Sequence, residues 1–476
     1  MLSRRRFLAS SLAMAAALRI TPHAVAAPLG RPVRVGFVGI GMKGSAHLGN
    51  LLQMAAHDID GRRLVEVVAV CDLLERQCVE SQGHAEALGL PQPTAYFGGE
   101  REFERMAAEE DLDLIYTATP WRWHTPVCLA ALGSGSHAAT EVPAAVTLED
   151  CHRLVEAASA ADRHCVMMEN VNYMRAEMAI WRMVREGLLG EIVHYEGGYL
   201  HDTRHLKAQD EHDGLWLAEH HHLRNGSLYP THAIGPAAMY LDINYGDRLD
   251  YLVSMSSNAR GLGAYMTERL PAGHPKRERG YANGDVNTTL IKTKRGASIV
   301  VKHDTDLPRP YSRRNLVQGT GGLVRGFPTF NIALDPAPSN ESGPVFNAHH
   351  KWSGDPSYLE RYEHPLWRRV REEGLGTFPD EAAASLEQTR TDGAMWDYRM
   401  ATEIRNGDFL EDYRLVAAIA DGRAPDYDVS DAATWSAIAP LSETSVAERS
   451  RPVDVPDFTN GKWESRPPLA VDVRGA

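Results

Sequence analysis

The chain has 476 residues, enough for two or three domains, and its 43% hydrophobic and 24% charged residues are ordinary values for a globular protein. The formal net charge is −13 and no long basic run follows the first residues, which argues against nucleic-acid binding. After those first residues, no stretch of the sequence has the length and apolar character expected of a membrane span.

Residues 1–27 have the features of an export signal. Three consecutive arginines begin at Arg4, an apolar run extends from Phe7 to Leu18, and the small residues around Val25 offer a cleavage site. The segment SRRRFL resembles the twin-arginine signal, whose export machinery carries folded proteins. An ordinary secretory signal with three arginines is the alternative. We therefore expect a periplasmic or secreted protein.

The cysteines agree with folding before export. They are five in number and no C-x-x-C motif occurs: Cys71, Cys78, Cys128, Cys151 and Cys165. A secreted disulfide scaffold would show a denser and even set. A protein that folds in the reducing cytoplasm needs no disulfides.

The first part of the mature chain alternates between predicted strands and helices. Buried strands are expected at 33–40, 64–70, 112–117 and 138–142, and another closes the series before Asn170. Helices are expected after the glycines at 39–44, at 126–132 and after Thr147, which is placed as an N-cap. This alternation predicts an α/β domain over residues 33–170 with a doubly wound parallel sheet of the Rossmann type.

The pattern changes after Asn170. A helix is expected from Met174 to Glu186, and the runs at 191–201, 251–259, 287–305 and 313–322 alternate as antiparallel strands do. Two late helices are expected at 392–407 and 413–422. We predict an α+β domain over residues 171–448 with a mostly antiparallel sheet, followed by a tail at 449–476 that wraps the surface.

A glycine motif between the first strand and helix predicts a dinucleotide site. Gly39, Gly41 and Gly44 form G-x-G-x-x-G in the context that this motif requires, where the helix N-terminus favours a pyrophosphate. Asp72 ends the next strand, where an acid accepts the adenosine ribose hydroxyls and repels a 2′-phosphate. We therefore expect NAD rather than NADP. A structural turn without a ligand, and a solvent-facing Asp72, are the alternatives.

The segment Trp121-Arg122-Trp123-His124 follows the strand at 112–117, at the sheet edge that faces ligands. We expect it to clamp the cofactor by stacking and hydrogen bonds. The alternative is an aromatic loop that packs on the second domain.

Three adjacent histidines, His220 to His222, lie near Glu219 and Asp213 and raise the question of a metal. Adjacent residues on a strand point to opposite faces, and no H-x-x-x-H helix pattern is evident. We expect a polar substrate loop here and no metal.

The order of these features resembles the oxidoreductases related to glucose–fructose oxidoreductase and inositol dehydrogenase. Their fifth strand ends in Glu-Lys-Pro, whose lysine serves dehydrogenase catalysis. Here the sequence is Glu141-Val142-Pro143, and valine cannot donate a proton. This departure argues against a standard sugar dehydrogenase.

The same valine, with MENVNY at 168–173, SLYPTHAIGP at 227–236 and the block at 431–463, closely resembles glycoside hydrolase family 109. The resemblance implies an NAD-dependent α-N-acetylgalactosaminidase with a second domain whose open sheet face often pairs with a copy. One departure is the stretch TDGAMWD at 391–397, where the family tends to have His-Gly-Gly-Met-Asp. A sugar-contacting histidine is therefore missing from that stretch, which leaves the substrate open.

The resemblance also implies roles for individual residues. The residues implied to touch NAD are Met42, Lys43, Asp72, Trp121 to His124, Glu141, Val142 and Asn170, besides the glycines of the motif. Those implied to touch the sugar are Tyr199, Arg224, Tyr229, Pro230, Thr231, His232 and Tyr311, and Tyr229 also reaches the nicotinamide.

The implied reaction is hydrolysis by oxidation of sugar carbon 3, removal of the carbon 2 proton, elimination at carbon 1, addition of water and re-reduction, an exception to the usual two-carboxylate scheme. It needs a base, and either Tyr229 or His232 fits, with Arg224 or the nicotinamide charge expected to lower the pKa of the tyrosine.

Residues in these motifs also have a purely structural interpretation. His232 would be a core histidine, and Tyr173, Tyr199 and Tyr311 would be packing aromatics. Glu169, at the end of a strand, would be an ion-pair partner.

Two other functions compete with the glycosidase on a small-molecule or glycan substrate. One is a periplasmic NAD(P)-dependent sugar oxidoreductase, and the other is a sugar sensor that keeps NAD as a structural group. The glycosidase explains an exported dinucleotide enzyme, because a hydride that leaves and returns within one turnover needs no recycling partner. The oxidoreductase would hold NAD(P) tightly and pass hydride between two sugars, and the missing lysine of Glu-Lys-Pro argues against it.

Overall fold

The computed structural model describes residues 27–335, 351–378 and 398–469. The expected export signal, except its last residue, and the departure at 391–397 lie outside the described residues. The side chains of residues 398–402 are likewise not described.

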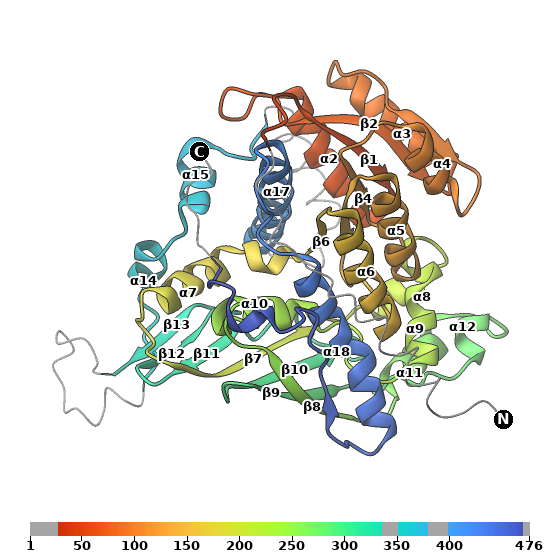
Figure 1. The fold of residues 1–476 in the computed structure, drawn as a ribbon. Helices are drawn as coiled ribbons and strands as arrows, with labels where there is room; N and C mark the ends of the chain where they lie inside the picture. The colour runs from red at the N-terminus through yellow and green to blue at the C-terminus, as the bar shows by residue number, and fades with distance from the viewer. Residues whose placement is uncertain (1–26, 336–350, 379–397, 470–476) are drawn as a thin grey trace, which may run out of the picture.

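The first domain is the predicted doubly wound parallel sheet (Figure 1). Its six strands run in the order β3-β2-β1-β4-β5-β6. They are β1 Val33–Val38, β2 Val65–Asp72, β3 Thr94–Phe97, β4 Leu114–Thr117, β5 His137–Glu141 and β6 Cys165–Met168. The helices are α2 Met42–Ala56, α3 Glu75–Ala87, α4 Glu102–Glu109, α5 His124–Ser134 and α6 Leu148–Ala161, with the 3-10 turn η1 Trp121–Trp123.

The sequence did not predict β3. Its four residues bury only Tyr96, so no apolar run marks the strand. By contrast, β4 and β6 bury every residue, which is typical of central parallel strands covered on both faces.

The second domain contains an eight-stranded sheet in the order β13-β12-β11-β7-β10-β9-β8-β14. The strands are β7 Ile192–Leu200, β8 Leu249–Ser256, β9 Asn287–Thr293, β10 Ser298–Asp304, β11 Leu316–Gly319, β12 Gly322–Arg325, β13 Asn331–Leu334 and β14 Val453–Asp454. The predicted antiparallel character is confirmed except at the centre, where β7 and β10 pair in parallel. Their carboxyl ends therefore meet at one edge of the sheet.

Helices of the second domain lie mainly on the face of this sheet that is turned toward the first domain (Figure 1). The helices that precede β9 in the chain are η2 Asn170–Tyr173, α7 Arg175–Arg185, α8 Arg204–Ala208, η3 His212–Leu215, α9 Leu217–Leu223, α10 Thr231–Leu241, α11 Gly261–Arg269 and α12 Pro275–Glu278. The later ones are α14 Pro356–Arg361, α15 Pro365–Glu373, α17 Tyr398–Ala420, α18 Val429–Ala447 and η4 Lys462–Glu464.

One helix, α17, replaces the two late helices that the sequence predicted. The expected break was at Gly407, but the helix passes through it. A Cβ at Gly407 would lie 3.0 Å from Met174 Sδ, so this glycine permits close packing rather than ending the helix.

The helices α17 and α18 join the two domains. α17 packs on α2 and η2, and α18 contacts α6 and β6 of the first domain as well as β8 of the second. α18 begins with a capping box at Asp428 and buries Trp435 completely. The described part of the C-terminal tail pairs β14 with β8 and buries Val455 and Phe458.

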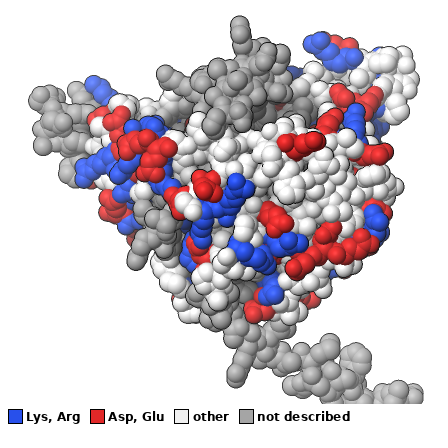
Figure 2. Space-filling view, turned by 90° about the horizontal axis from the view of Figure 1, so that it is seen from above, with Lys and Arg blue, Asp and Glu red and all other residues white. Residues whose placement is uncertain are grey.

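The surface is mixed in charge. Figure 2 shows acidic and basic side chains interspersed around an area without charged side chains. Across the described residues, none of the helices is both long and apolar enough to traverse a bilayer.

Candidate active site

One cavity of about 1220 Å³ lies between the two domains and collects most of the residues that the sequence singled out. The predicted residues that line it are Gly39, Gly41, Met42, Lys43, Asp72, Trp121 to His124, Glu141, Val142, Asn170, Tyr199, Arg224, Tyr229, His232 and Tyr311. The other three, Gly44, Pro230 and Thr231, are not in its lining and instead shape the backbone around it.

The glycine loop has the geometry of a pyrophosphate cradle. Gly39 turns the chain with φ +87°, a left-handed conformation that favours glycine. α2 begins after Gly41 without a side-chain cap, so its first N–H groups are free for an anion. A Cβ at Gly41 would meet nothing within 4 Å, whereas one at Gly44 would lie 1.9 Å from the Gly39 carbonyl oxygen. The loop therefore fits a dinucleotide.

Asp72 is fixed at the end of β2. Its Oδ2 accepts a hydrogen bond from Ile40 N at 2.7 Å and its Oδ1 accepts one from Leu74 N at 2.8 Å. A carboxylate has further lone pairs, so Asp72 can still accept the ribose hydroxyls while these bonds hold its orientation. This geometry agrees with the predicted role.

A residue that the sequence did not reveal holds two of the expected cofactor residues. Asp408 of α17 lies 2.8 Å from Lys43 Nζ and accepts a hydrogen bond from Asn170 Nδ2 at 2.6 Å. Lys43 Nζ also lies 3.8 Å from Glu141 Oε1. Only the fold brings the carboxylate of Asp408 to the glycine loop, so no local sequence signal identifies it.

A buried histidine of α2 extends this network. His47 Nε2 lies 3.0 Å from Glu141 Oε1 and Nδ1 lies 2.9 Å from Asp412 Oδ2, and the ring is fully buried. Burial opposes charge on the Glu141 carboxyl, but the hydrogen bond from His47 and the charge of Lys43 lower its pKa to about 2. Burial opposes charge on His47 too, yet Asp412 raises its pKa well above the usual value. The cavity wall beside Val142 therefore carries a fixed carboxylate.

The aromatic segment at 121–124 packs on the second domain, as one of the two interpretations expected, and it also lines the cavity at the sheet edge where the cofactor contact is predicted. Trp121 lines the cavity and packs on second-domain rings, with ring centroids 4.7 Å from His220 and 5.8 Å from Tyr229. His124 has its ring nitrogens 2.7 Å from Pro143 O and 2.6 Å from Thr119 O. The imidazole of His124 therefore braces the turn rather than offering a free nitrogen to a ligand.

The sugar side of the cavity contains a compact aromatic group. Tyr199 stacks on Tyr229 with ring centroids 4.4 Å apart, and the His232 ring lies 4.8 Å from Tyr229. The ring centroid of Tyr311 lies 6.2 Å from that of Tyr199. These four residues come from β7, the segment before α10, α10 itself and the segment before β11, so the fold confirms that they converge.

His232 is paired with a carboxylate. It lies in the first turn of α10, and its Nδ1 donates to Glu169 Oε1 at 2.6 Å. Glu169 follows β6 and also accepts a hydrogen bond from Val171 N at 3.1 Å. Glu169 is therefore the hydrogen-bond partner of His232, and this bond leaves His232 Nε2 as the ring nitrogen available to a substrate.

The expected effect of Arg224 on Tyr229 is not found. The Arg224 guanidinium is bound to Glu443 of α18, with Nε 2.9 Å from its Oε1. Burial, reinforced by Glu141, raises the pKa of Tyr229 well above its usual value. Without a bound cofactor Tyr229 is thus a neutral phenol.

The three histidines form part of the helix α9, so the prediction of a loop was wrong. His220 faces Trp121, His221 is buried with its Nδ1 2.9 Å from Asp306 Oδ2, and His222 bonds to Gly280 O. No grouping of residues suited to a metal ion occurs in the described part of the chain.

Several cavity residues escaped the sequence reasoning. They are His201, Lys207 and His303, in addition to Asp408 near the cofactor side; Asp213 and His221 belong to the segment that was expected to contact the substrate, and both line the cavity. Burial and then the charge of Glu141 raise the pKa of Asp213. The alternating pattern of β10 did indicate that His303 belonged to a strand, but not which cavity that strand would border.

Comparison with known proteins agrees with this architecture. Residues 33–170 match the model of the oxidoreductase family with an NAD-binding Rossmann fold. Residues 173–377 and 397–465 match the model of the glycosyl hydrolase 109 C-terminal domain. Together the two models cover both sides of the cavity. The match of the first domain to an NAD-binding family identifies its cofactor as NAD.

Full-length relatives carry the same assignment. A glycosyl hydrolase family 109 protein of Shewanella sp. (strain W3-18-1) is 40% identical over 441 residues, which are 92% of this chain and 88% of the relative. One from Shewanella pealeana gives the same identity and coverage.

Solved structures share the fold at lower identity. Levoglucosan dehydrogenase in complex with NADH and levoglucosan has a TM-score of 0.62 at 18% identity, covering 90% of this chain and 100% of that one. An inositol dehydrogenase homologue from Azotobacter vinelandii, complexed with NAD⁺, has a TM-score of 0.57 at 15% identity, covering 90% and 99%.

The glycine geometry yields a testable pair of substitutions. Gly44→Ala forces a Cβ into the Gly39 carbonyl, so we expect a loss of stability without NAD of about 1–3 kcal/mol, as for other overpacked sites. The Cβ introduced by Gly41→Ala would meet no protein atom, so we expect unchanged stability without NAD. We expect NAD to bind roughly tenfold more weakly, a loss of about 1.4 kcal/mol in binding free energy. Thermal unfolding with and without NAD measures both. Equal behaviour of the two variants would contradict this division of roles.

Proposed function

The chain belongs to glycosyl hydrolase family 109 and is an NAD-dependent glycoside hydrolase, and we propose that it cleaves α-N-acetylgalactosaminide-like glycosides by oxidation, elimination, water addition and re-reduction. The observation that carries this proposal is His232, which lines the same cavity as the dinucleotide loop and is bonded from behind to the buried carboxylate of Glu169. Bound NAD would supply a hydride acceptor at sugar carbon 3 and return the hydride to the same carbon.

His232 is the proposed base at carbon 2. The Glu169 carboxylate holds its Nδ1–H and stabilises the imidazolium that forms when Nε2 accepts a proton. Tyr229 is stacked on Tyr199 and half-buried, and its neutral phenol is suited to donate a hydrogen bond to a sugar oxygen. The geometry thus favours His232 over Tyr229 as the base, a choice that the sequence left open.

The position of Val142 supports elimination rather than net dehydrogenation. Val142 lines the cavity next to Glu141 and is buried, and an apolar side chain cannot relay the hydroxyl proton to solvent. Lys43, the nearest amine, is engaged by Asp408 and Glu141. Oxidation at carbon 3 releases a hydroxyl proton together with the hydride in either reaction. The proposed cycle returns both to the sugar, so a polar group inside the cavity can hold that proton for one turnover, whereas a net sugar oxidation would have to pass it to solvent at this wall.

Export is part of the proposal. We propose that residues 1–27 direct the folded, NAD-loaded protein through the twin-arginine pathway to the periplasm. The five cysteines support folding in a reducing compartment, because all of them are free and buried. No structural disulfide would have to form after export.

The reaction is tested with p-nitrophenyl α-N-acetylgalactosaminide in heavy water. We expect release of p-nitrophenol, deuterium at carbon 2 of the sugar and no net NADH, measured by mass spectrometry and absorbance. A panel of α- and β-linked sugars extends the test, because elimination is chemically open to both anomers. Net NADH without cleavage would favour the oxidoreductase, and no turnover of any glycoside would favour a sugar sensor.

The assignment of the base is tested by two substitutions. His232→Ala should lower the cleavage rate by roughly 10²–10⁴-fold, the usual contribution of general base catalysis, while oxidation at carbon 3 still proceeds. We therefore expect reduced nicotinamide to accumulate on the protein and deuterium exchange at carbon 2 to disappear. Glu169→Gln should cause a smaller accumulation of reduced nicotinamide and a smaller loss of deuterium exchange at carbon 2.

Tyr173→Phe is the matched control for these variants. Tyr173 is buried beside the site, donates to Asp426 and is not part of the cavity lining, so its loss should leave exchange and cleavage unchanged. Normal carbon 2 exchange in His232→Ala would rule out His232 as the base.

The export proposal predicts tight retention of NAD. Protein purified from the periplasm should contain close to one NAD per chain, measured by extraction and chromatography. Replacing Arg5 and Arg6 by lysine should keep the holoprotein in the cytoplasm. Purification of a cofactor-free periplasmic protein would contradict the link between loading and export.

A further inference from the structure

The end of the cavity next to β5 is where the reacting end of NAD belongs. The fixed carboxylate of Asp72 on β2 suits the adenosine, and the glycine loop after β1 suits the pyrophosphate. A dinucleotide crosses a doubly wound sheet where the strand order reverses, so the nicotinamide belongs over β4 and β5, on the other side of β1. Glu141 ends β5 and lines the cavity there with Lys43 and Asn170. The charges around Glu141 therefore border the ring that carries the hydride.

The charges at this end do not cancel. Lys43 Nζ lies 2.8 Å from Asp408 Oδ2 and 3.8 Å from Glu141 Oε1, so one cation serves two acids. His47 and Asp412 form a second pair, with Nδ1 2.9 Å from Oδ2, and this pair is neutral as a whole whichever partner holds the proton. The sum over these five side chains is therefore one negative charge.

A further acid shows that no cation is left in this cluster. Glu411 of α17 is 1% exposed, and neither of its carboxyl oxygens has a hydrogen-bond partner among the described residues. His47 Nε2 lies 4.0 Å from Glu411 Oε1 but is already bonded to Glu141. Burial raises the pKa of Glu411 well above its usual value, so this carboxyl stays protonated and adds no charge.

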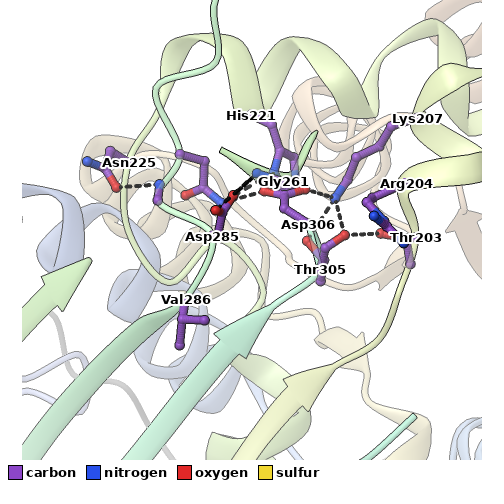
Figure 3. Close-up of polar contacts among 12 residues, drawn as sticks. Thr203, Arg204, Lys207, His221, Asn225, Gly261, Asp285, Val286, Thr305 and Asp306 are labelled. Carbon is purple, nitrogen blue, oxygen red and sulfur yellow. Dashed lines mark hydrogen bonds and ion pairs between the residues drawn. The ribbon is translucent and has the colours of Figure 1, made fainter. Parts of the chain in front are cut away.

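The buried ions on the sugar side, by contrast, are paired one to one. In the Asp306 cluster, which consists of Lys207, His221, Thr305 and Asp306, Lys207 Nζ lies 2.6 Å from Asp306 Oδ1 and also donates to Thr305. Figure 3 shows Lys207 and His221 converging on Asp306 from two helices. Burial lowers the pKa of His221, so its ring is uncharged and the cluster is neutral. Of these two clusters, only the one at the cofactor end is unbalanced.

The two redox forms of NAD differ in charge at this same end. The oxidised nicotinamide ring carries one positive charge and the reduced ring is neutral, whereas the pyrophosphate has the same charge in both forms. An uncompensated negative charge in a wall shielded from bulk water attracts the oxidised ring and has no such effect on the reduced ring.

We propose that Glu141 and Asp408 make the site selective for the oxidised cofactor, because together they give the wall one more acid than Lys43 can balance. This selectivity concerns NAD itself and does not depend on which glycoside is cleaved. Tighter binding of NAD⁺ than of NADH lowers the reduction potential of the bound couple. A hydride taken from a substrate is then readily given back, and the resting protein holds NAD⁺.

Competition between the two redox forms tests this selectivity. The holoprotein is incubated without sugar in equal concentrations of free NAD⁺ and NADH. Incubation continues until the bound ratio is the same whether the protein began with NAD⁺ or with NADH, and the bound nucleotides are then extracted and separated by chromatography. We expect the wild type to hold NAD⁺ in roughly tenfold excess, the order expected for one charge at an effective dielectric constant of about 20. Equal amounts of the two forms, or an excess of NADH, would overturn the proposal.

Charge substitutions identify the acids responsible. Asp408→Asn keeps an oxygen for Asn170 Nδ2 but leaves Lys43 to balance Glu141. We therefore expect the preference for NAD⁺ to fall roughly tenfold, which corresponds to about 30 mV in the potential of the bound couple. Glu141→Gln should have the same effect, and it decides the question if Asp408→Asn retains neither form.

Two control variants separate charge from structure. The double variant Lys43→Gln with Asp408→Asn loses one cation and one acid, so it should regain the wild-type preference even though both forms bind more weakly. Glu403→Gln removes an acid of the same helix that lies outside the cavity lining, and its preference should match the wild type. An unchanged preference in both Asp408→Asn and Glu141→Gln, or no recovery in the double variant, would contradict the proposed role of the acid excess.

Discussion

The structure depends on the compensation of buried charge where α17 meets the first domain. The buried acids Glu141, Asp408 and Asp412 lie against the buried His47 and the partly exposed Lys43, and each buried ion would be unfavourable without its partners. Because the acids Asp408 and Asp412 belong to a helix far along the chain, the glycine loop and the end of β5 take their final positions only when α17 is in place. The cofactor wall is thus a product of both domains, although its motif lies in one.

The sugar side follows from a different constraint, the parallel pairing of β7 and β10 inside an otherwise antiparallel sheet. Parallel strands end at the same edge, so Tyr199 and His303 face one cavity and the segments after them meet there. The contact of Lys207 with Thr305 and Asp306 secures that edge. The arrangement keeps charge inside the wall and leaves uncharged rings toward the cavity, which suits sugar hydroxyls.

Sequence reasoning identified the elements whose signal is local. The glycine motif, Asp72, the central strands and the convergence of Tyr199, Tyr229, His232 and Tyr311 were all anticipated, the last from family resemblance. It did not identify Asp408, Asp412 or the Asp306 cluster, because their partners lie far away in sequence. The errors have physical causes: β3 buries one side chain, Gly407 serves close packing, His220 to His222 fit a helical turn, and Glu443 of α18 engages Arg224.

The dependence of the cofactor wall on α17 bears on the proposed export. A segment so late in the chain completes the contacts of Lys43, His47 and Asn170, so the wall that we propose for NAD is complete only in a chain that has folded through residue 412. An exporter of unfolded chains would deliver a protein that must find NAD outside the cytoplasm, where the dinucleotide is not recycled. Under the proposed cycle the hydride returns to the sugar in each turnover, so one NAD bound before export serves indefinitely. The proposed redox cycle, the interdomain charge network and the proposed twin-arginine leader all agree with one requirement, that the cofactor travels with the protein.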